Sequence, residues 1–388
     1  MSLIGTELKF EKLFKLSTLC MRVNGSHPSS SRNFFWVFRF LFVIGTFITH
    51  FGLILNSIIF YDIHQENATE HVCRSGALLI IAFIITIKYF TLVLHRKGNE
   101  WLINYVDADF GIYKSLTEEE QDAVLKFAHK GTWVCKLWFF TPFITGGVFT
   151  VRPIIIIIYR YLFGEYHTEK IFEYTYPSGL DERKDELVVF LPMLVLNICF
   201  VLCAASMYAG FDSLGPTFML HACGQLEVAK IKISKLFINE IIDPRTLRCE
   251  VRNIIIHLQS IYKFVDCMKK TLLAWYEISL KVTTVSIPFT ALAIVESLKR
   301  GNVNVEFISM EFVCLAHMFV PCYYGGLLLE TGESIFTSIY SSGWETLPVI
   351  DVRMQLLFML MRANRPLAVR SVFRVISLDT FADVSNLL

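Results

Sequence analysis

The chain has 388 residues, of which 54% are hydrophobic and 18% are charged, and its formal net charge is +1. One soluble domain of this length could not hide so much apolar surface, so we expect lipid to surround much of the chain. The near-zero net charge, without a Lys/Arg stripe that contains aromatic residues, argues against a nucleic-acid partner.

Seven apolar blocks predict an all-α membrane protein with seven transmembrane helices. A span needs about 20 apolar residues, because about 30 Å of hydrocarbon is crossed at 1.5 Å per residue. Six blocks meet this length, and the seventh is weaker. The blocks cover residues 34–61, 76–95, 132–158, 187–211, 272–295, 305–329 and 354–388.

Lys and Arg are concentrated in alternate connections. The N-terminal segment, the second connection and the fourth connection together hold nineteen of them, against seven in the first, third and fifth. The positive-inside rule therefore predicts a cytoplasmic N-terminus and, after seven crossings, an extracellular C-terminus. Asn67, in the sequon Asn67-Ala68-Thr69, then lies outside and is a candidate glycosylation site.

The fourth connection has the composition of helices rather than of a loop. Apolar residues recur at helical spacing on both sides of Asp243-Pro244. We interpret this region as two helices that extend the fourth and fifth spans into the cytoplasm, the alternative being an amphipathic hairpin on lipid headgroups. The expected divisions are 1–33 (cytoplasmic segment), 34–211 (spans one to four), 212–271 (cytoplasmic helical anchor), 272–329 (spans five and six) and 330–388 (anchor helix and a short seventh span).

Neither catalysis nor metal binding finds support in the motifs. The patterns HExxH, GxSxG and GxxxxGK are absent, and none of the ten cysteines forms a CxxC pair. We therefore expect no enzyme activity, no cofactor and no metal. Lys88 lies near the inner end of its apolar block and is expected to snorkel to the interface.

The C-terminal segment resembles the signature of insect odorant receptors. A second matching stretch is Asp212-Ser213-Leu214 with His221 and Gln225-Leu226, and a third surrounds His257. The C-terminal match comprises Ile339-Tyr340, Trp344, Leu347-Pro348, Arg353, Leu357, Met361-Arg362, Arg365-Pro366-Leu367, Ser377-Leu378 and Thr380-Phe381.

This resemblance implies a seven-helix subunit of a ligand-gated cation channel in the plasma membrane of olfactory sensory neuron dendrites. The chain is similar to odorant-specific subunits, which pair with the shared coreceptor Orco in tetramers, and not to Orco itself. The ligand would be a small volatile odorant. The resemblance also implies that cytoplasmic residues anchor the subunits to one another: Asp212, His221, Gln225, His257, Tyr340, Trp344, Arg353, Arg362, Arg365 and Pro366.

An odorant pocket needs aromatic and thioether walls with one or two polar groups. The outer halves of the second, third, fourth and sixth spans can supply these side chains, although any one of them could instead serve ordinary helix packing. We favour Phe149, Met193 and Thr145. The full set comprises Phe83, Thr86, Thr145, Phe149, Thr150, Phe190, Met193, Leu194, Asn197, Phe307 and Met310.

The end of the chain departs from the family pattern. Only seven residues follow Thr380-Phe381, where the family has a long apolar stretch that lines the pore. Phe381, Asp383 and Val384 are the residues expected near the pore, and we expect the chain to bind odorant but to conduct poorly. The alternative classes are a gustatory-type channel subunit, a G-protein-coupled receptor and a transporter.

Overall fold

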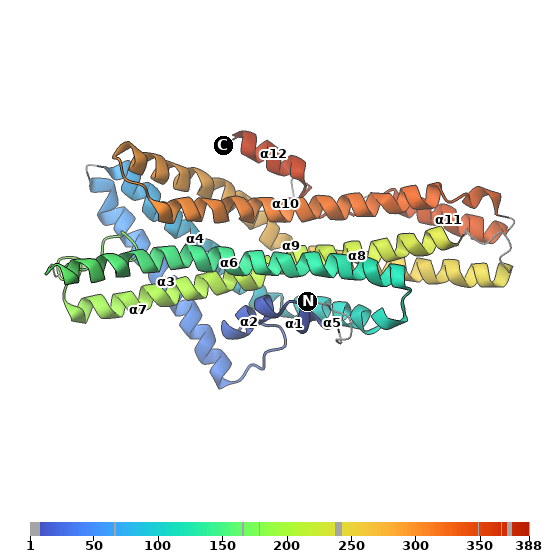
Figure 1. The fold of residues 1–388 in the computed structure, drawn as a ribbon, viewed down its shortest axis with the longest axis horizontal. Coiled ribbons are helices and arrows are strands. Elements are labelled where there is room, and N and C mark those ends of the chain that lie inside the picture. Colours follow the sequence, from blue (N-terminus) through green and yellow to red (C-terminus); the bar gives the residue numbers. More distant parts are fainter. Residues whose placement is uncertain are drawn as a thin grey trace.

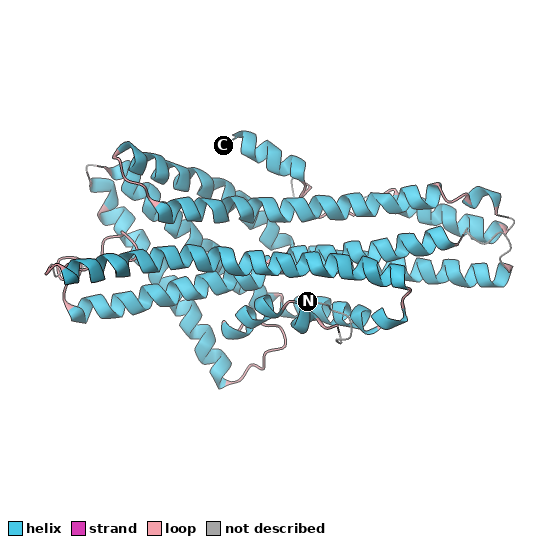
Figure 2. Cartoon of the chain, in the orientation of Figure 1, coloured by secondary structure: helices cyan, strands magenta, loops and turns pink. Residues whose placement is uncertain are grey.

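Helices make up nearly all of the described chain, as Figure 2 shows. The computed structural model describes residues 8–65, 67–164, 167–177, 179–236, 243–347, 349–365, 367–370 and 375–387. Within these ranges there is no strand, and the β-type pairing consists of one isolated antiparallel bridge between Arg370 and Val375. The predicted all-α class is confirmed.

The α-helices alternate between long rods and short connecting pieces. A single turn of π-helix, η3 (Tyr208–Asp212), lies between α7 and α8. The α-helices are α1 (Phe10–Leu13), α2 (Lys15–Val23), α3 (Phe34–Phe60), α4 (Ala68–Leu94), α5 (Arg96–Gly111), α6 (Glu118–Leu162), α7 (Leu187–Met207), α8 (Leu214–Lys235), α9 (Pro244–Lys299), α10 (Val305–Tyr340), α11 (Ile350–Ala363) and α12 (Leu378–Leu387). Short 3-10 turns are η1 (Asp62–His64), η2 (Tyr113–Ser115) and η4 (Trp344–Thr346).

The long helices run along one axis of an elongated bundle (Figure 1). α6, α7, α8, α9 and α10 follow this axis, α3 crosses it at a tilt, and α1, α2 and α5 lie together beside it near the N-terminus. We call the end where α6 is followed by α7 the α6–α7 end, and the opposite end the α8 end. α11 lies at the α8 end, whereas α12 lies along α10.

Six helical stretches in the described residues are long and apolar enough to cross a membrane. They are Phe34–His64, Ala68–Leu94, Glu118–Leu162, Leu187–Lys235, Ala274–Lys299 and Val305–Thr346. The chain is thus a multi-pass membrane protein. The weak seventh block is divided between α11 and the ten-residue α12.

Local capping sets where several helices begin. The side chain of Asn33 accepts a hydrogen bond from the backbone N–H of Trp36 at the start of α3. Thr117 and Glu120 form a reciprocal capping box at the start of α6. Pro244, whose missing N–H costs nothing in a first turn, begins α9. α6 and α9 therefore begin well before their apolar blocks do.

Lys88 occupies the centre of the bundle, and the prediction that it snorkels is wrong. Its side chain is fully buried, and its Nζ lies 2.5 Å from Oδ2 of Asp212, which ends the π-helical turn. His317 Nε2 lies 3.5 Å from the other oxygen of this carboxylate. The ammonium group also lies 3.4 Å from the ring centroid of Tyr208. A buried charge needs such partners because hydrocarbon cannot solvate it.

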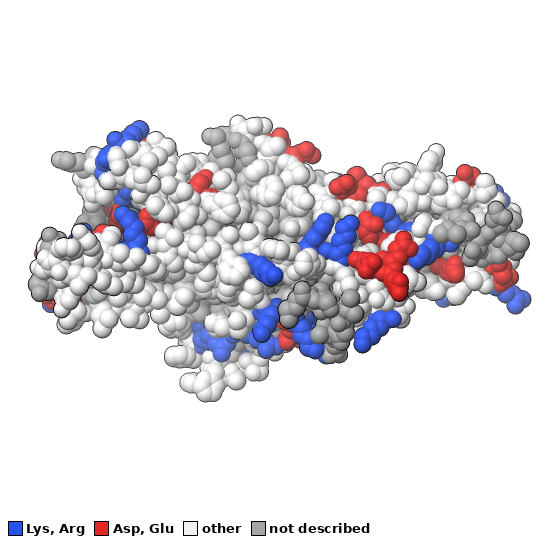
Figure 3. Space-filling model, viewed as in Figure 1, with Lys and Arg blue, Asp and Glu red and all other residues white. Residues whose placement is uncertain are grey.

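Charged side chains are unevenly distributed over the surface (Figure 3). On the face shown, most Lys and Arg residues lie over α1, α2 and α5 and over the half of the bundle that contains α8. The surface over α7 and the adjoining half of α6 is almost free of charge on this face. This is the pattern expected for a bundle whose α6–α7 half lies in hydrocarbon.

Candidate functional site

An apolar cavity lies inside the half of the bundle towards the α6–α7 end. Counted with its open side, it contains about 580 Å³ of space not filled by atoms. Helices α4, α6, α7 and α10 supply most of its wall. The lining residues are Leu78, Ile81, Pro142, Thr145, Gly146, Phe149, Phe172, Phe200, Val201, Ala204, Ala205, Tyr208, Met310, Val313 and Cys314.

Aromatic rings form one wall of this cavity. Phe172, from the connection between α6 and α7, lies with its ring centroid 5.6 Å from that of Phe149 and 5.9 Å from that of Phe200. His50 of α3 stacks on Phe200 at 4.1 Å. These separations are those of interacting aromatic pairs, so the wall is packed and apolar.

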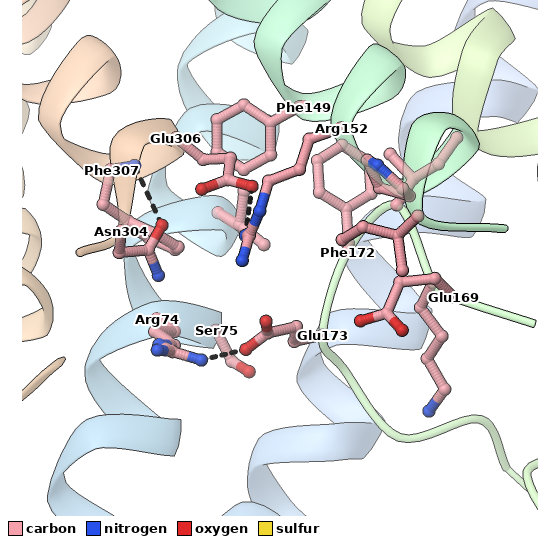
Figure 4. A pocket seen from close by; sticks show the side chains of 15 residues that line it. Arg74, Ser75, Phe149, Arg152, Glu169, Phe172, Glu173, Asn304, Glu306 and Phe307 are labelled. Carbon is pink, nitrogen blue, oxygen red and sulfur yellow. Dashed lines mark hydrogen bonds and ion pairs between the residues drawn. The ribbon is translucent and has the colours of Figure 1, made fainter. Parts of the chain in front are cut away.

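A second, polar hollow lies above the same wall towards the α6–α7 end. Leu78, Phe149 and Phe172 line both the hollow and the apolar cavity, so these three residues separate the two spaces. Figure 4 shows the side chains of the polar hollow, which we call the vestibule. Its remaining lining residues are Arg74, Ser75, Arg152, Pro153, Ile156, Glu169, Lys170, Ile171, Glu173, Asn304, Glu306 and Phe307.

Ion pairs hold the rim of the vestibule together. Arg74 of α4 pairs with Glu173 of the α6–α7 connection and, at 2.5 Å, with Glu70. Arg152 of α6 pairs with Glu306 of α10. Charge pairs thus bridge the helices and the connection around the vestibule, whereas the neighbouring cavity is lined mainly by apolar side chains.

An ion pair within the α6–α7 connection holds this segment in a compact shape. Lys170 bonds to Asp181 and, at 3.0 Å, to the backbone oxygen of Tyr174. Partial burial acts to raise the pKa of Asp181, but the hydrogen bonds from Lys170 and from the backbone N–H of Tyr176, together with the charge of Lys170, lower this pKa below its ordinary value. The tightened loop holds Phe172, which is 4% exposed, in the cavity wall.

Four of the expected pocket residues meet at these two spaces. Thr145, Phe149 and Met310 line the apolar cavity, and Phe307 joins Phe149 in the vestibule. The hydroxyl of Thr145 donates to the backbone oxygen of Ser309 at 3.4 Å. The geometry thus brings these residues of α6 and α10 together.

The other expected pocket residues line neither space. Phe83 is 44% exposed on the outside of α4. Thr86 and Thr150 donate to backbone oxygens of their own helices. Buried Asn197 accepts from Tyr174 at 3.0 Å and bonds to His50 at 2.9 Å. The remaining three, which are half-buried on α7, are Phe190, Met193 and Leu194.

Sequence reasoning missed Phe172 and Tyr208 in this cavity. Phe172 follows no helical periodicity, because it belongs to a connection. Tyr208 begins the five-residue π-helical turn, in which hydrogen bonds join residues five apart instead of four, and this wider turn shifts the face that follows. A Tyr at the end of an apolar block was the only signal in the sequence.

Some of the expected anchor residues form side-chain contacts between different helices of this chain. Asp212 pairs with Lys88, and His221 Nε2 lies 2.8 Å from Asp109 Oδ2. Nε2 of His257 donates to Oε1 of Gln225 at 2.9 Å, which links α9 to α8. Burial first, and then the charge of Lys232, lowers the pKa of His257 to about 4.

The remaining anchor residues lie at the α8 end. The Arg362 guanidinium lies 4.1 Å from the ring centroid of Tyr262, and Arg353 donates to the backbone oxygen of Glu345. Tyr340 is 67% exposed, and Arg365 is also exposed. Trp344 is half-buried in η4, and Pro366 lies outside the described residues.

The residues expected near the pore belong to α12. The ring of Phe381 meets that of Phe319 on α10 edge to face at 5.3 Å. Asp383 is exposed, and the side chain of Val384 lies outside the described residues. Asn67 is exposed at the start of α4, on the α6–α7 end of the bundle. Across the described ranges, no group of three or more His, Cys, Asp or Glu side chains could hold a metal ion.

Comparison with known proteins identifies the fold and the family. Two solved structures of the insect olfactory receptor OR5 from Machilis hrabei, one of them in complex with eugenol, superpose with a TM-score of 0.73. Their sequence identities are 12% for the eugenol complex and 13% for the other, and each match covers 97% of this chain and 94% of that receptor. The family described as 7tm Odorant receptor matches residues 68–388. The chain therefore belongs to the 7tm odorant receptor family, whose members are receptors and not enzymes.

Proposed function

We propose that this chain is the odorant-binding subunit of a ligand-gated, non-selective cation channel and that it assembles with the coreceptor Orco. The observation that carries the proposal is the apolar cavity between α4, α6, α7 and α10. A volatile odorant is small and apolar, and it gains most from leaving water for such a space. The solved relative with eugenol is a receptor of this fold with a small aromatic ligand, which supports the same use here.

The vestibule offers a route from water to this cavity if the α6–α7 end faces the outside. Leu78, Phe149 and Phe172 lie between the two spaces, so a ligand that enters through the vestibule must displace these side chains. The charge distribution supports this orientation, since most Lys and Arg residues on the face shown in Figure 3 lie over α1, α2 and α5 and over the half of the bundle that contains α8. The N-terminus would then lie in the cytoplasm, and α8 and the first half of α9 would form the cytoplasmic extension.

An exposed apolar face at the α8 end supports assembly with other subunits. Ile350, Met354, Phe358 and Met361 of α11 are between 46% and 67% exposed. Next to them lies a groove between α9 and α11, which is lined by residues such as Tyr262 and Arg362. The volume of this groove, counted with its open side, is about 810 Å³. In the proposed topology this face lies in the cytoplasm beyond the membrane, where only another protein surface can cover it.

Two substitutions on α6 test odorant binding. Phe149 is 6% exposed in the cavity wall, whereas Phe140 is 53% exposed on the same helix. The full chain is expressed with Orco, and currents are recorded for a panel of volatile esters, alcohols, aldehydes and acids. Phe149→Leu should change the order of ligand potencies, with shifts of about tenfold for some ligands, which corresponds to about 1.4 kcal/mol.

The matched control, Phe140→Leu, should keep the wild-type order. Equal loss of the response to every ligand in Phe149→Leu, with surface expression intact, would place this residue in gating rather than in recognition. Currents from this chain in cells that lack Orco would contradict the proposed assembly. An epitope tag at the N-terminus that is accessible in unpermeabilised cells would contradict the proposed orientation.

A further inference from the structure

The cavity wall contains almost no polar side chains. Thr145, Tyr208 and Cys314 are the lining residues that carry a hydroxyl or thiol. Two of these groups already have partners in the protein. The Thr145 hydroxyl donates to a backbone oxygen of α10, and the Cys314 sulfur lies 3.5 Å from Oγ of Ser286.

The third polar group of the cavity wall is the hydroxyl of Tyr208, and it has no hydrogen-bond partner among the described residues. Tyr208 is 8% exposed and lines the cavity, and no residue in the described ranges forms a hydrogen bond with its hydroxyl. Some polar side-chain atoms of the described residues are fully enclosed by the protein and have no partner, and the Tyr208 hydroxyl is not among them. The hydroxyl therefore keeps access to open space, and the cavity is the space that Tyr208 lines in the described structure.

An unpaired hydroxyl in an apolar space is unfavourable, because it has lost water without gaining a partner. Buried polar groups in proteins almost always find a partner, and the exceptions need an explanation. A ligand with one polar atom and an otherwise apolar body would satisfy this group. The same ligand would fill the remaining volume with contacts to Phe149, Phe200 and Met310.

The charge beneath Tyr208 selects the kind of polar atom. Lys88 Nζ lies 3.4 Å from the ring centroid and is fixed there by Asp212 at 2.5 Å. A cation at the face of a phenol draws electron density from the ring. The O–H group then donates a hydrogen bond more strongly and accepts one less well, by the same polarisation that strengthens linked hydrogen bonds.

We propose that Tyr208 determines ligand specificity by donating a hydrogen bond from the floor of the cavity to an acceptor oxygen of the odorant. The ligand class is a neutral ketone, aldehyde, ester or ether with an apolar body. Hydrocarbons lack the acceptor, and cationic amines would meet the nearby Lys88. This inference rests on the proposed odorant-binding function and names its ligand class.

Isosteric ligand pairs test the inference on the full chain expressed with Orco. Each pair consists of a methyl ketone and the alkene in which a methylene group replaces the carbonyl oxygen. Half-maximal concentrations are measured by current, and ligand-induced thermal stabilisation is measured on the purified chain. The wild-type chain should prefer the ketone, and Tyr208→Phe should lower the ketone-to-alkene potency ratio about fivefold, the effect of one neutral hydrogen bond.

Tyr89→Phe is the matched control. Tyr89 is a buried tyrosine of α4 whose hydroxyl donates at 3.1 Å to the backbone oxygen of Asn24 and does not line the cavity. This variant should retain the ketone preference. Equal potency of ketone and alkene on the wild-type chain would overturn the inference without any variant, as would a preserved preference in Tyr208→Phe. If no compound evokes current or stabilises the chain, the proposed odorant-binding function itself fails.

Discussion

The ion pair between Lys88 and Asp212 should dominate the stability of the bundle interior. The two side chains are 0% and 4% exposed, and Nζ lies 2.5 Å from Oδ2. Asp212→Asn removes the negative charge and leaves the Lys88 ammonium in a site that neither water nor lipid can solvate. Removal of one partner from a buried pair costs about 3–5 kcal/mol, because the other charge remains uncompensated.

The double variant should recover most of this loss. Lys88→Met combined with Asp212→Asn removes both charges and keeps a side chain of similar length in the site of the lysine. Replacement of a whole buried pair by well-packed apolar side chains of similar volume is often close to neutral in stability, and the double variant likewise leaves no uncompensated charge of this pair in the interior. The expected order of stability is therefore wild type, then the double variant, then Asp212→Asn, with the double variant closer to wild type.

Thermal unfolding of the full chain in detergent and its surface expression in cells are the measurements. Asp351→Asn is the control, since Asp351 pairs with Arg248 at 2.7 Å but both side chains are about half exposed. This variant should unfold like the wild type, because solvent screens such pairs. A double variant no more stable than Asp212→Asn, or an Asp212→Asn variant as stable as wild type, would refute the reasoning.

Three further predictions concern single sites. A Cβ on Gly146 would lie 2.5 Å from Val201 Cγ1 in the cavity wall, whereas one on Gly147 meets nothing within 4 Å. Gly146→Ala should therefore raise half-maximal odorant concentrations about tenfold, with Gly147→Ala near wild type in the same current recording. The pKa of His257 is lowered to about 4 from the ordinary 6.5, so the unfolded chain binds the proton first and stability falls as pH drops from 6.5 towards 4. His257→Gln should flatten the change of Tm over this window, and an unchanged slope would contradict the assignment. Asn67→Gln should remove glycosidase-sensitive mass on a gel, and a wild-type chain without such mass would oppose an extracellular α6–α7 end.

The spans could be predicted from the sequence because hydropathy reports directly on the surrounding lipid. The starts of α3, α7 and α10 at Phe34, Leu187 and Val305 coincide with the expected apolar blocks. Helix length could not be predicted in the same way. α6 begins at Glu118 and α9 at Pro244, far outside their blocks, because a helix continues beyond an apolar block wherever its polar turns are capped and packed.

The interior ion pair could not be predicted, because its partners are 124 residues apart. Lys88 near the end of an apolar block is compatible with snorkelling as long as its partner is unknown. Its true environment depends on how α4 packs against the junction of α7 and α8. Both residues are visible in the sequence, and Asp212 belongs to the stretch that resembles insect odorant receptors. Only the three-dimensional structure shows that the two side chains are in contact.

Helix register explains why only part of the cavity could be predicted. Thr145, Phe149 and Met310 lie on regular helices, where a spacing of 3.6 residues per turn gives the buried face. The π-helical turn from Tyr208 to Asp212 adds residues to one turn, so the face counted along α7 no longer gives the direction of the residues after Met207. This turn places Tyr208 at the cavity floor and Asp212 beside Lys88. Any substitution that restored α-helical register there would therefore disturb the cavity floor and the buried ion pair together.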